Sequence, residues 1–158
     1  MRLTAMKRIP AAAYVLAALA LTAACGTDTG QGRRSLSVTN VPWEARSVTV
    51  DGRTYPAPEG VGMELAPDSV RAGGGKIDGR GGCNGFQGTA AVDKESMRVS
   101  GYTVTMEACL DDESTAFQKK FLGTLSGANR LSLSEDGRTL RLTDGADALT
   151  FTRGARSR

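Results

Sequence analysis

Short segments in which apolar and polar residues alternate occupy the last third of the chain. Residues 131–133, 139–142 and 148–151 alternate in this way, and the dipeptides Asp136-Gly137 and Asp144-Gly145 separate them. Alternation with a period of two is typical of a strand with one face on the core and the other in water, and Asp-Gly is a strong hairpin signal. The pattern predicts a three-stranded antiparallel meander.

The middle of the chain carries the same signals less regularly. Residues 47–50 and 53–55 flank Asp51-Gly52, which predicts a hairpin with a type I′ turn. Further β-prone runs cover residues 87–92, 97–100 and 102–106. We therefore expect a mainly antiparallel β domain.

One segment departs from the period of two. Five of its apolar residues fall on one helical face: Ala116, Phe117, Phe121, Leu122 and Leu125. Asp111, Asp112 and Glu113 stand at its start and Gly127 follows its end, as helix capping and the macrodipole favour. The segment predicts one helix over about residues 111–126, which makes the fold class α+β. The three acids also admit a general acid–base pair or a cation site, but a helix N-terminus is a sufficient structural reason for them.

Five glycines surround one cysteine and one asparagine in GRGGCNGFQG, residues 79–88. Glycine-rich loops often hold phosphate, but that motif requires GxxxxGK followed by Ser or Thr, and the nearest candidate, Gly75-Lys76, is followed by Ile77. A dinucleotide fingerprint also fails, because Asn84 stands at its third glycine position. We expect this stretch to hold the chain itself rather than a ligand.

Each residue type in this stretch suits such a structural role. The glycines allow either a positive φ or a close approach of the backbone to a neighbouring strand. Asn84 tolerates the left-handed region and hydrogen-bonds nearby backbone, while Phe86, two residues further on, is expected to point into the core. The alternative makes Asn84 a polar anchor in a binding cleft.

The N-terminus has the layout of an export signal. Basic residues precede an apolar run over residues 11–20, and small residues then lead to Cys25. The run is too short for a stable membrane-spanning helix. The junction resembles the lipobox of bacterial lipoproteins, which implies a signal peptide over residues 1–24 and a lipidated Cys25. Thr22 stands where the lipobox usually has Leu, and ordinary signal cleavage is the alternative.

The segments at the two ends of the mature chain are polar. Residues 25–35 are rich in Gly, Thr and charge and predict a flexible tether, and residues 154–158 form a basic tail. Three of the 20 basic residues belong to residues 1–24, which leaves 17 basic residues against 17 acidic ones. A neutral mature chain lacks the basic footprint of a nucleic-acid-binding protein. The partner that the sequence does indicate is the membrane, through a lipid anchor at Cys25.

The chain has three cysteines and no histidine. If Cys25 carries lipid, Cys83 and Cys109 remain as a pair, and exported proteins form disulfides. A bridge between them closes a loop of about 26 residues and contributes roughly 3 kcal/mol in the chain-entropy model, whereas two separate buried thiols are the alternative. Without CxxC spacing or histidine we expect no metal site. Without histidine or a GxSxG motif we expect no enzyme, no catalytic residue and no cofactor.

Taken in order, these residues resemble the META domain (HslJ-like) family. The similarity rests on Trp43, on Gly82-Cys83-Asn84 with Phe86 and Gly88, on Thr105 with Ala108-Cys109, on Phe121, Leu122 and Leu125, and on the closing segments 140–142 and 149–151. It assigns residues 36–153 to this domain. Glu107 and Gln118 depart from the family pattern, which often has Met and Glu at these positions.

The resemblance implies a compact, mainly antiparallel β domain, with a curved or barrel-like sheet and one packed helix. It also implies cell-envelope roles such as stress response and antibiotic tolerance, without established catalysis. We therefore expect a non-enzymatic lipoprotein, anchored on the extracytoplasmic face of the cell membrane, with Asn84, Phe86 and Trp43 as binding or structural residues. The alternatives are an extracytoplasmic module that binds a small ligand or acts as an inhibitor, and a hydrolase.

Overall fold

The computed structural model describes residues 37–70, 74–107 and 109–155. The predicted signal peptide over residues 1–24, the predicted lipidation site Cys25 and the rest of the tether lie outside the described residues. The last three residues of the basic tail lie outside them as well. Within the part that is described, no helix combines the length and the apolar character that a membrane span requires.

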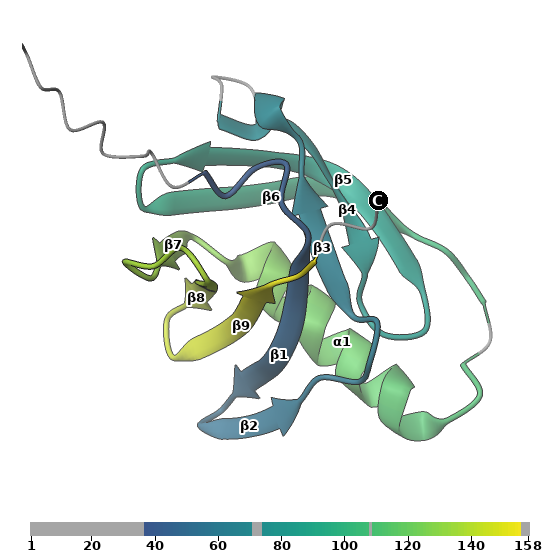
Figure 1. Ribbon diagram of the computed structural model, residues 1–158. Coiled ribbons are helices and arrows are strands. Elements are labelled where there is room, and N and C mark those ends of the chain that lie inside the picture. The colour runs from purple at the N-terminus through teal and green to yellow at the C-terminus, as the bar shows by residue number, and fades with distance from the viewer. Residues whose placement is uncertain (1–36, 71–73, 108, 156–158) are drawn as a thin grey trace, which may run out of the picture. The chain divides into compact units, whose positions relative to one another are not determined.

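Nine strands and one α-helix make up the described part of the chain (Figure 1). The strands are β1 (Trp43–Val50), β2 (Arg53–Pro56), β3 (Gly62–Leu65), β4 (Gly75–Arg80), β5 (Gly85–Asp93), β6 (Ser96–Val104), β7 (Arg130–Leu133), β8 (Thr139–Asp144) and β9 (Asp147–Arg153). The helix α1 (Asp112–Gly127) connects β6 to β7, and a 3₁₀ turn, η1 (Pro67–Val70), follows β3.

The strands form one antiparallel sheet that closes on itself. Its order is β2-β1-β3-β4-β5-β6-β7-β8-β9, and β1 pairs in addition with β9. Strand β1 achieves this because one of its edges pairs with β3 and then β2, while the other pairs with β9. Eight strands therefore complete a barrel, and β2 extends from it as the second arm of a hairpin. This architecture confirms the predicted α+β class with a barrel-like sheet and one helix.

The predicted hairpins occur where Asp-Gly marks a turn. Asp51 and Gly52 have φ values of 51° and 75°, as a type I′ turn requires, and join β1 to β2. Strands β7, β8 and β9 form the predicted meander. Gly137 and Gly145 in its two turns also have positive φ, at 68° and 58°.

The structure differs from the sequence-based expectation at β6. Two separate runs, 97–100 and 102–106, were expected, but one strand covers Ser96–Val104. Gly101 has φ 58°, and the β5–β6 register shifts between Gln87 and Thr89. A bulge with a left-handed glycine interrupts the alternation without ending the strand, because it inserts an extra residue opposite Gly88.

Two strands were not predicted at all. Strand β3 has four residues, and β4 carries a single buried apolar side chain, Ile77, between glycines and charges. The glycine-rich stretch therefore includes the end of β4 and the start of β5, and only residues 81–84 form the connection between them.

Helix α1 confirms the predicted helix to within one residue at each end. Phe117, Phe121 and Leu125 are buried as expected, whereas Ala116 is exposed and Thr124 is buried instead. Gly127 is the last helical residue rather than a left-handed cap, and a Cβ there would collide with the Asp144 side chain of β8.

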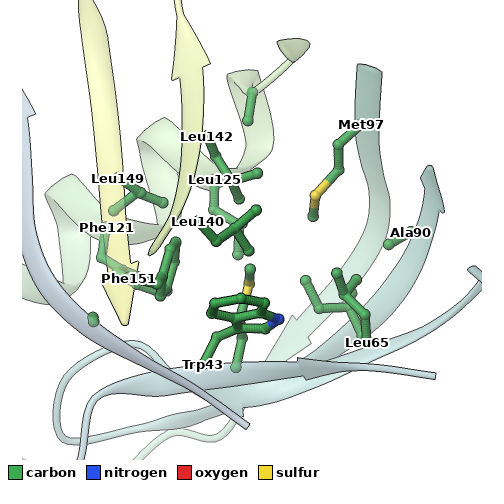
Figure 2. Packing of buried hydrophobic residues seen from close by; sticks show 14 of the residues in the cluster. Trp43, Leu65, Ala90, Met97, Phe121, Leu125, Leu140, Leu142, Leu149 and Phe151 are labelled. Carbon is green, nitrogen blue, oxygen red and sulfur yellow. The ribbon is translucent and has the colours of Figure 1, made fainter. Parts of the chain in front are cut away.

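The core lies between the inner face of the barrel and α1. All four phenylalanines and the single tryptophan are buried in it. The Phe121 ring of α1 lies with its centroid 5.9 Å from that of Phe86 on β5 and 6.0 Å from that of Phe151 on β9. Figure 2 shows Phe121 and Phe151 on one side of the core and Met97 and Ala90 on the other. Few aromatic residues suffice for this core because all the phenylalanine rings and the indole are used in the interior.

Candidate functional site

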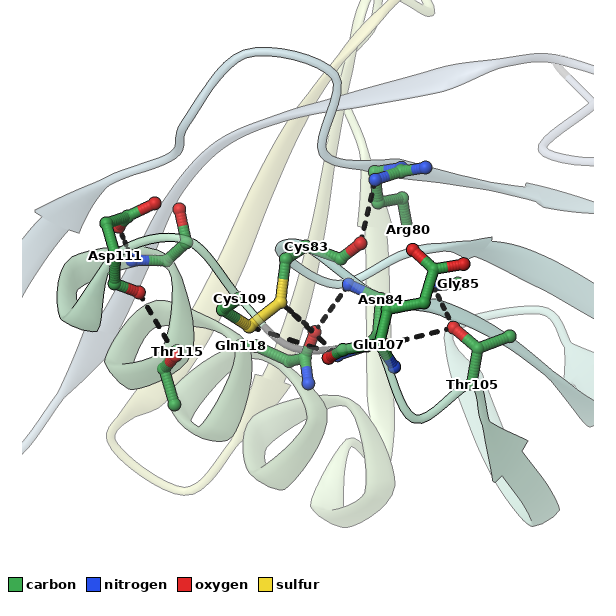
Figure 3. The surroundings of a disulfide bond; sticks show 11 residues. Arg80, Cys83, Asn84, Gly85, Thr105, Glu107, Cys109, Asp111, Thr115 and Gln118 are labelled. Carbon is green, nitrogen blue, oxygen red and sulfur yellow. Dashed lines mark hydrogen bonds between the residues drawn. A yellow bond between two sulfur atoms is a disulfide. The ribbon is translucent and has the colours of Figure 1, made fainter.

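The two cysteine-containing segments meet beside the first turn of α1. Cys83, in the β4–β5 connection, and Cys109, just before the helix, form a disulfide with Cα atoms 5.5 Å apart (Figure 3). The predicted pairing is therefore present, and the alternative of two separate thiols is wrong. The bond ties the start of the helix to one end of the barrel.

Asn84 holds the neighbouring segment with its side chain. Its Oδ1 accepts hydrogen bonds from the Glu107 backbone N–H at 2.7 Å and from the Thr105 hydroxyl at 3.1 Å. Its Nδ2 donates to the Glu107 carbonyl at 3.2 Å. The amide thus pairs with both backbone groups of one residue, as a neighbouring strand would. Because Asn84 is only 6% exposed, these bonds satisfy polar groups that water does not reach.

The helix contributes one further polar contact to this network. The Oε1 atom of Gln118 accepts a hydrogen bond from the Asn84 backbone N–H at 2.8 Å and lies 3.8 Å from the Cys83 sulfur. A glutamate, which the family pattern often has here, would supply an equivalent acceptor oxygen. Glu107, the other departure from the pattern, takes part through its backbone, so its side-chain identity matters little to the network.

Most glycines of this stretch serve close packing rather than unusual backbone angles, Gly85 being the exception because a Cβ there would make only ordinary contacts. None of Gly79, Gly81, Gly82, Gly85 and Gly88 has a positive φ, and neither does Asn84, so of the two roles considered for the glycines the close approach of the backbone is the one that the structure shows. At Gly82 a Cβ would lie 2.7 Å from the Gln118 Cβ and 2.8 Å from the Ser114 carbonyl oxygen. The glycine-rich connection can therefore lie directly on α1, which brings Cys83 within reach of Cys109.

Phe86 and Trp43, the other two sequence-predicted residues, have structural roles. Phe86 is 4% exposed and packs on Phe121, as expected. Trp43 is 1% exposed, and its indole N–H donates to the Val38 carbonyl at 2.8 Å. Neither side chain is available to a ligand at the surface.

The acidic cluster behaves as the helix start that the sequence predicted. The Asp111 carboxylate accepts a hydrogen bond from the Ser114 backbone N–H at 2.6 Å. Hydrogen bonds from Ser114 hold the pKa of Asp111 below its usual range. Asp112 and Glu113 are exposed. Among the described residues, no group of three or more His, Cys, Asp or Glu side chains is arranged to hold a metal ion.

Sequence reasoning missed two exposed apolar side chains beside the disulfide. Met106 is 99% exposed and Leu110 is 102% exposed. Met106 lies between Thr105 and Glu107, which both hydrogen-bond to Asn84. Leu110 lies between Cys109 of the disulfide and Asp111, which caps the helix. Their signal in the sequence was weak, namely two large apolar residues in a segment otherwise rich in acids.

An open groove lies at the other end of the helix. It measures about 1480 Å³ and runs between the tip of the β5–β6 hairpin and strands β7 and β8. Its apolar lining includes Val92, Leu131 and Leu133, and its charged lining includes Arg130 and Arg141. A second groove, of about 610 Å³, is lined by the starts of β1 and β3, the connection between β2 and β3, and the end of β4.

Comparison with known proteins identifies the architecture. The sequence matches the META domain family over residues 36–156. The chain belongs to this family. The disulfide and the Asn84 network therefore lie inside a META domain. None of the curated proteins matches the sequence at a significant level.

Two solved structures share this META domain's fold. One is described as the NMR structure of the protein from Burkholderia xenovorans; it has a TM-score of 0.62 and 20% identity, and the match covers 75% of this chain and 85% of that one. The other, described as an NMR structure of the protein, has a TM-score of 0.54 and 16% identity over 73% of this chain and 90% of that one. At these identities the likeness establishes the fold alone.

Proposed function

We propose that the protein is an extracytoplasmic, membrane-tethered lipoprotein whose META domain acts by binding and not by catalysis. The observation that carries the proposal is the disulfide between Cys83 and Cys109. Structural disulfides persist outside the reducing cytosol, which agrees with the export signal and the lipobox-like junction at Cys25. Lipid on Cys25 would also explain why the chain has one cysteine that takes no part in the bridge.

The polar groups of the family motif support binding over catalysis. The side-chain oxygen and nitrogen of Asn84 are both used to hold residues 105–107, and the Gln118 oxygen is used to hold Asn84. A catalytic group must instead be free to reach a reacting atom. The motif therefore serves to fix a surface segment in one conformation, which lowers the entropy cost of binding a partner.

The anchor is tested on the native protein. Mass spectrometry of the mature protein should find an acylated N-terminal Cys25, and detergent phase separation should place it in the detergent phase. Cys25→Ala should release the chain from the membrane without unfolding it, because the domain begins well after this residue. An unmodified wild-type chain in the aqueous phase would overturn the proposal.

The cellular role that we propose is in envelope stress response or antibiotic tolerance. It rests on the HslJ-like resemblance of the motif. A deletion strain should become more sensitive to envelope-active antibiotics or heat, and the wild-type gene should restore tolerance while the Cys25→Ala gene should not. Unchanged survival of the deletion strain under both stresses would count against this role.

A second candidate function is the binding of a small extracytoplasmic ligand. The groove beside β7 and β8 favours it, since apolar side chains there combine with a few polar and charged ones. A thermal-shift screen against envelope metabolites and antibiotics tests it. Stabilisation that disappears in Arg141→Ser, an exposed residue of the groove, but persists in Tyr102→Ser, which lies outside the groove, would support this function.

A further inference from the structure

The segment beside the disulfide presents an unusual surface, which we call the knob. It consists of the exposed apolar residues Met106 and Leu110 with four exposed acids: Glu107, Asp111, Asp112 and Glu113. No basic residue occurs between residues 105 and 118. Two fully exposed large apolar side chains on a segment held by the bridge and by the helix cap offer apolar area that a partner can cover. A partner for the knob therefore needs an apolar recess with basic residues around it.

The groove beside β7 and β8 has this character. Val70 at its edge is 56% exposed and Leu133 is half-buried, while Val92 and Leu131 belong to the core and form the floor at 6% and 5% exposed. Its charged residues are three basic ones, Lys94, Arg130 and Arg141, and two acidic ones, Asp93 and Glu95.

Arg130 and Arg141 are placed to act together. In the β7–β8 register Arg130 pairs with Thr143 and Ser132 pairs with Arg141, so the two arginines are diagonal neighbours on one face of the sheet. Two adjacent guanidinium groups are opposite in charge to the closely spaced carboxylates of Asp111, Asp112 and Glu113 and can pair with them.

A single molecule cannot bring its own knob and groove together. The knob lies just before and within the first turn of α1, and Asn129 and Arg130 of the groove follow its last turn. The helix has 16 residues, which at the usual rise separates its ends by about 24 Å. Figure 1 shows the segment between β6 and α1 and the tip of β7 at opposite ends of the helix.

We propose that the knob of one copy binds the groove of a second copy, head to tail. Such a heterologous contact leaves one free knob and one free groove on every open assembly, so it propagates into open chains or closes into rings. Weak affinity suffices if the copies share one membrane, since tethering raises their effective concentration; this last point alone rests on the proposed lipid anchor.

The test uses the full chain with Cys25→Ser, purified after export so that the Cys83–Cys109 bridge forms. Sedimentation velocity over a concentration series up to about 1 mM should show reversible association that weakens as salt is raised. The knob variant Met106→Ser/Leu110→Ser and the groove variant Arg130→Glu/Arg141→Glu should each stay monomeric, with dissociation constants raised at least roughly tenfold. Thermal melts should match the parent chain, because these side chains are on the surface.

Mixing the two variants is the decisive experiment. The knob variant retains a groove and the groove variant retains a knob, so an equimolar mixture should form one-to-one dimers and nothing larger. Tyr102→Ser, which removes an exposed aromatic outside the knob, and Arg53→Glu, which reverses a charge outside the groove, should associate like the parent chain.

Three results would overturn the proposal. They are a parent chain that is monomeric at every concentration, a groove variant that still associates alone, and a mixture that remains monomeric. Lipidation plays no part in this measurement in solution, so these failures would leave the proposed anchor at Cys25 untouched. Conversely, an unlipidated Cys25 would not alter the expected association.

Discussion

Removal of the disulfide should destabilise the domain mainly through its unfolded state. Cys83 and Cys109 are 26 residues apart, and the chain-entropy relation then gives a loss of about 3.5 kcal/mol for Cys83→Ser at 25 °C. The folded state should change little, because Asn84 still holds Glu107 through two backbone hydrogen bonds.

Urea denaturation of exported protein, followed by tryptophan fluorescence, measures this loss. Trp43 is a suitable probe because it is the only tryptophan and is buried in the native domain. We expect Cys83→Ser, Cys109→Ser and the double variant to share one midpoint, since each removes the same bond. A dithiol reductant should bring the wild-type chain to the same midpoint and should leave the double variant unchanged.

The slope of the transition provides an independent check. An unfolded chain without the bridge is more open, so the denaturant dependence of the free energy should be steeper in the variants than in the wild type. Equal slopes combined with a loss below about 1 kcal/mol would refute the entropic argument. Additive losses in the double variant would refute the bridge itself, since independent thiols would then be the source of the effect.

Three further predictions concern the contacts around the bridge. Asn84→Ala removes three side-chain hydrogen bonds to the 105–107 segment and should cost about 2–4 kcal/mol in urea denaturation; a loss below about 1 kcal/mol would show that water replaces them. Gly82→Ala should cost about 1–3 kcal/mol by pushing the loop off α1, whereas Gly123→Ala, whose Cβ meets nothing within 4 Å, should stabilise the helix by about 0.5–1 kcal/mol. The lowered pKa of Asp111 adds stability that is present above about pH 4 and is lost as the pH falls through that lowered value. Asp111→Asn keeps a capping group, so acid titrations of stability should be shallower for this variant below about pH 4, and identical curves would count against the cap.

Local signals in the sequence were sufficient for the elements that depend on local chemistry. The β1–β2 hairpin and the β7–β9 meander followed from Asp-Gly turns, and α1 followed from its apolar spacing and acidic start. The disulfide followed from the cysteine count together with the export signal. The residues that determine the turns and the helix are close in sequence. For the disulfide, only Cys83 and Cys109 remain as a pair once Cys25 is assigned to the lipobox-like junction.

The features that were missed depend on contacts between distant segments. Strand β4 has one buried apolar residue, Ile77, and it is a strand because β3 and β5 pair with it on both sides. The partner of Asn84 could not be predicted either, since it is the backbone of Glu107 and a backbone leaves no signature in composition. The exposure of Met106 and Leu110 likewise depends on how the bridge and the cap fix their segment.

The pairing of β1 with β9 has a consequence for how the domain folds. Ala45 near the start of the domain pairs with Phe151 near its end, so the barrel closes only when the last strand is available. Contacts between such distant residues carry a large loop-closure entropy and slow the folding reaction. A chain that stops before β9 leaves one edge of β1 unpaired and exposed to aggregation, so the domain reaches its native state as a complete chain and not by the stepwise addition of strands.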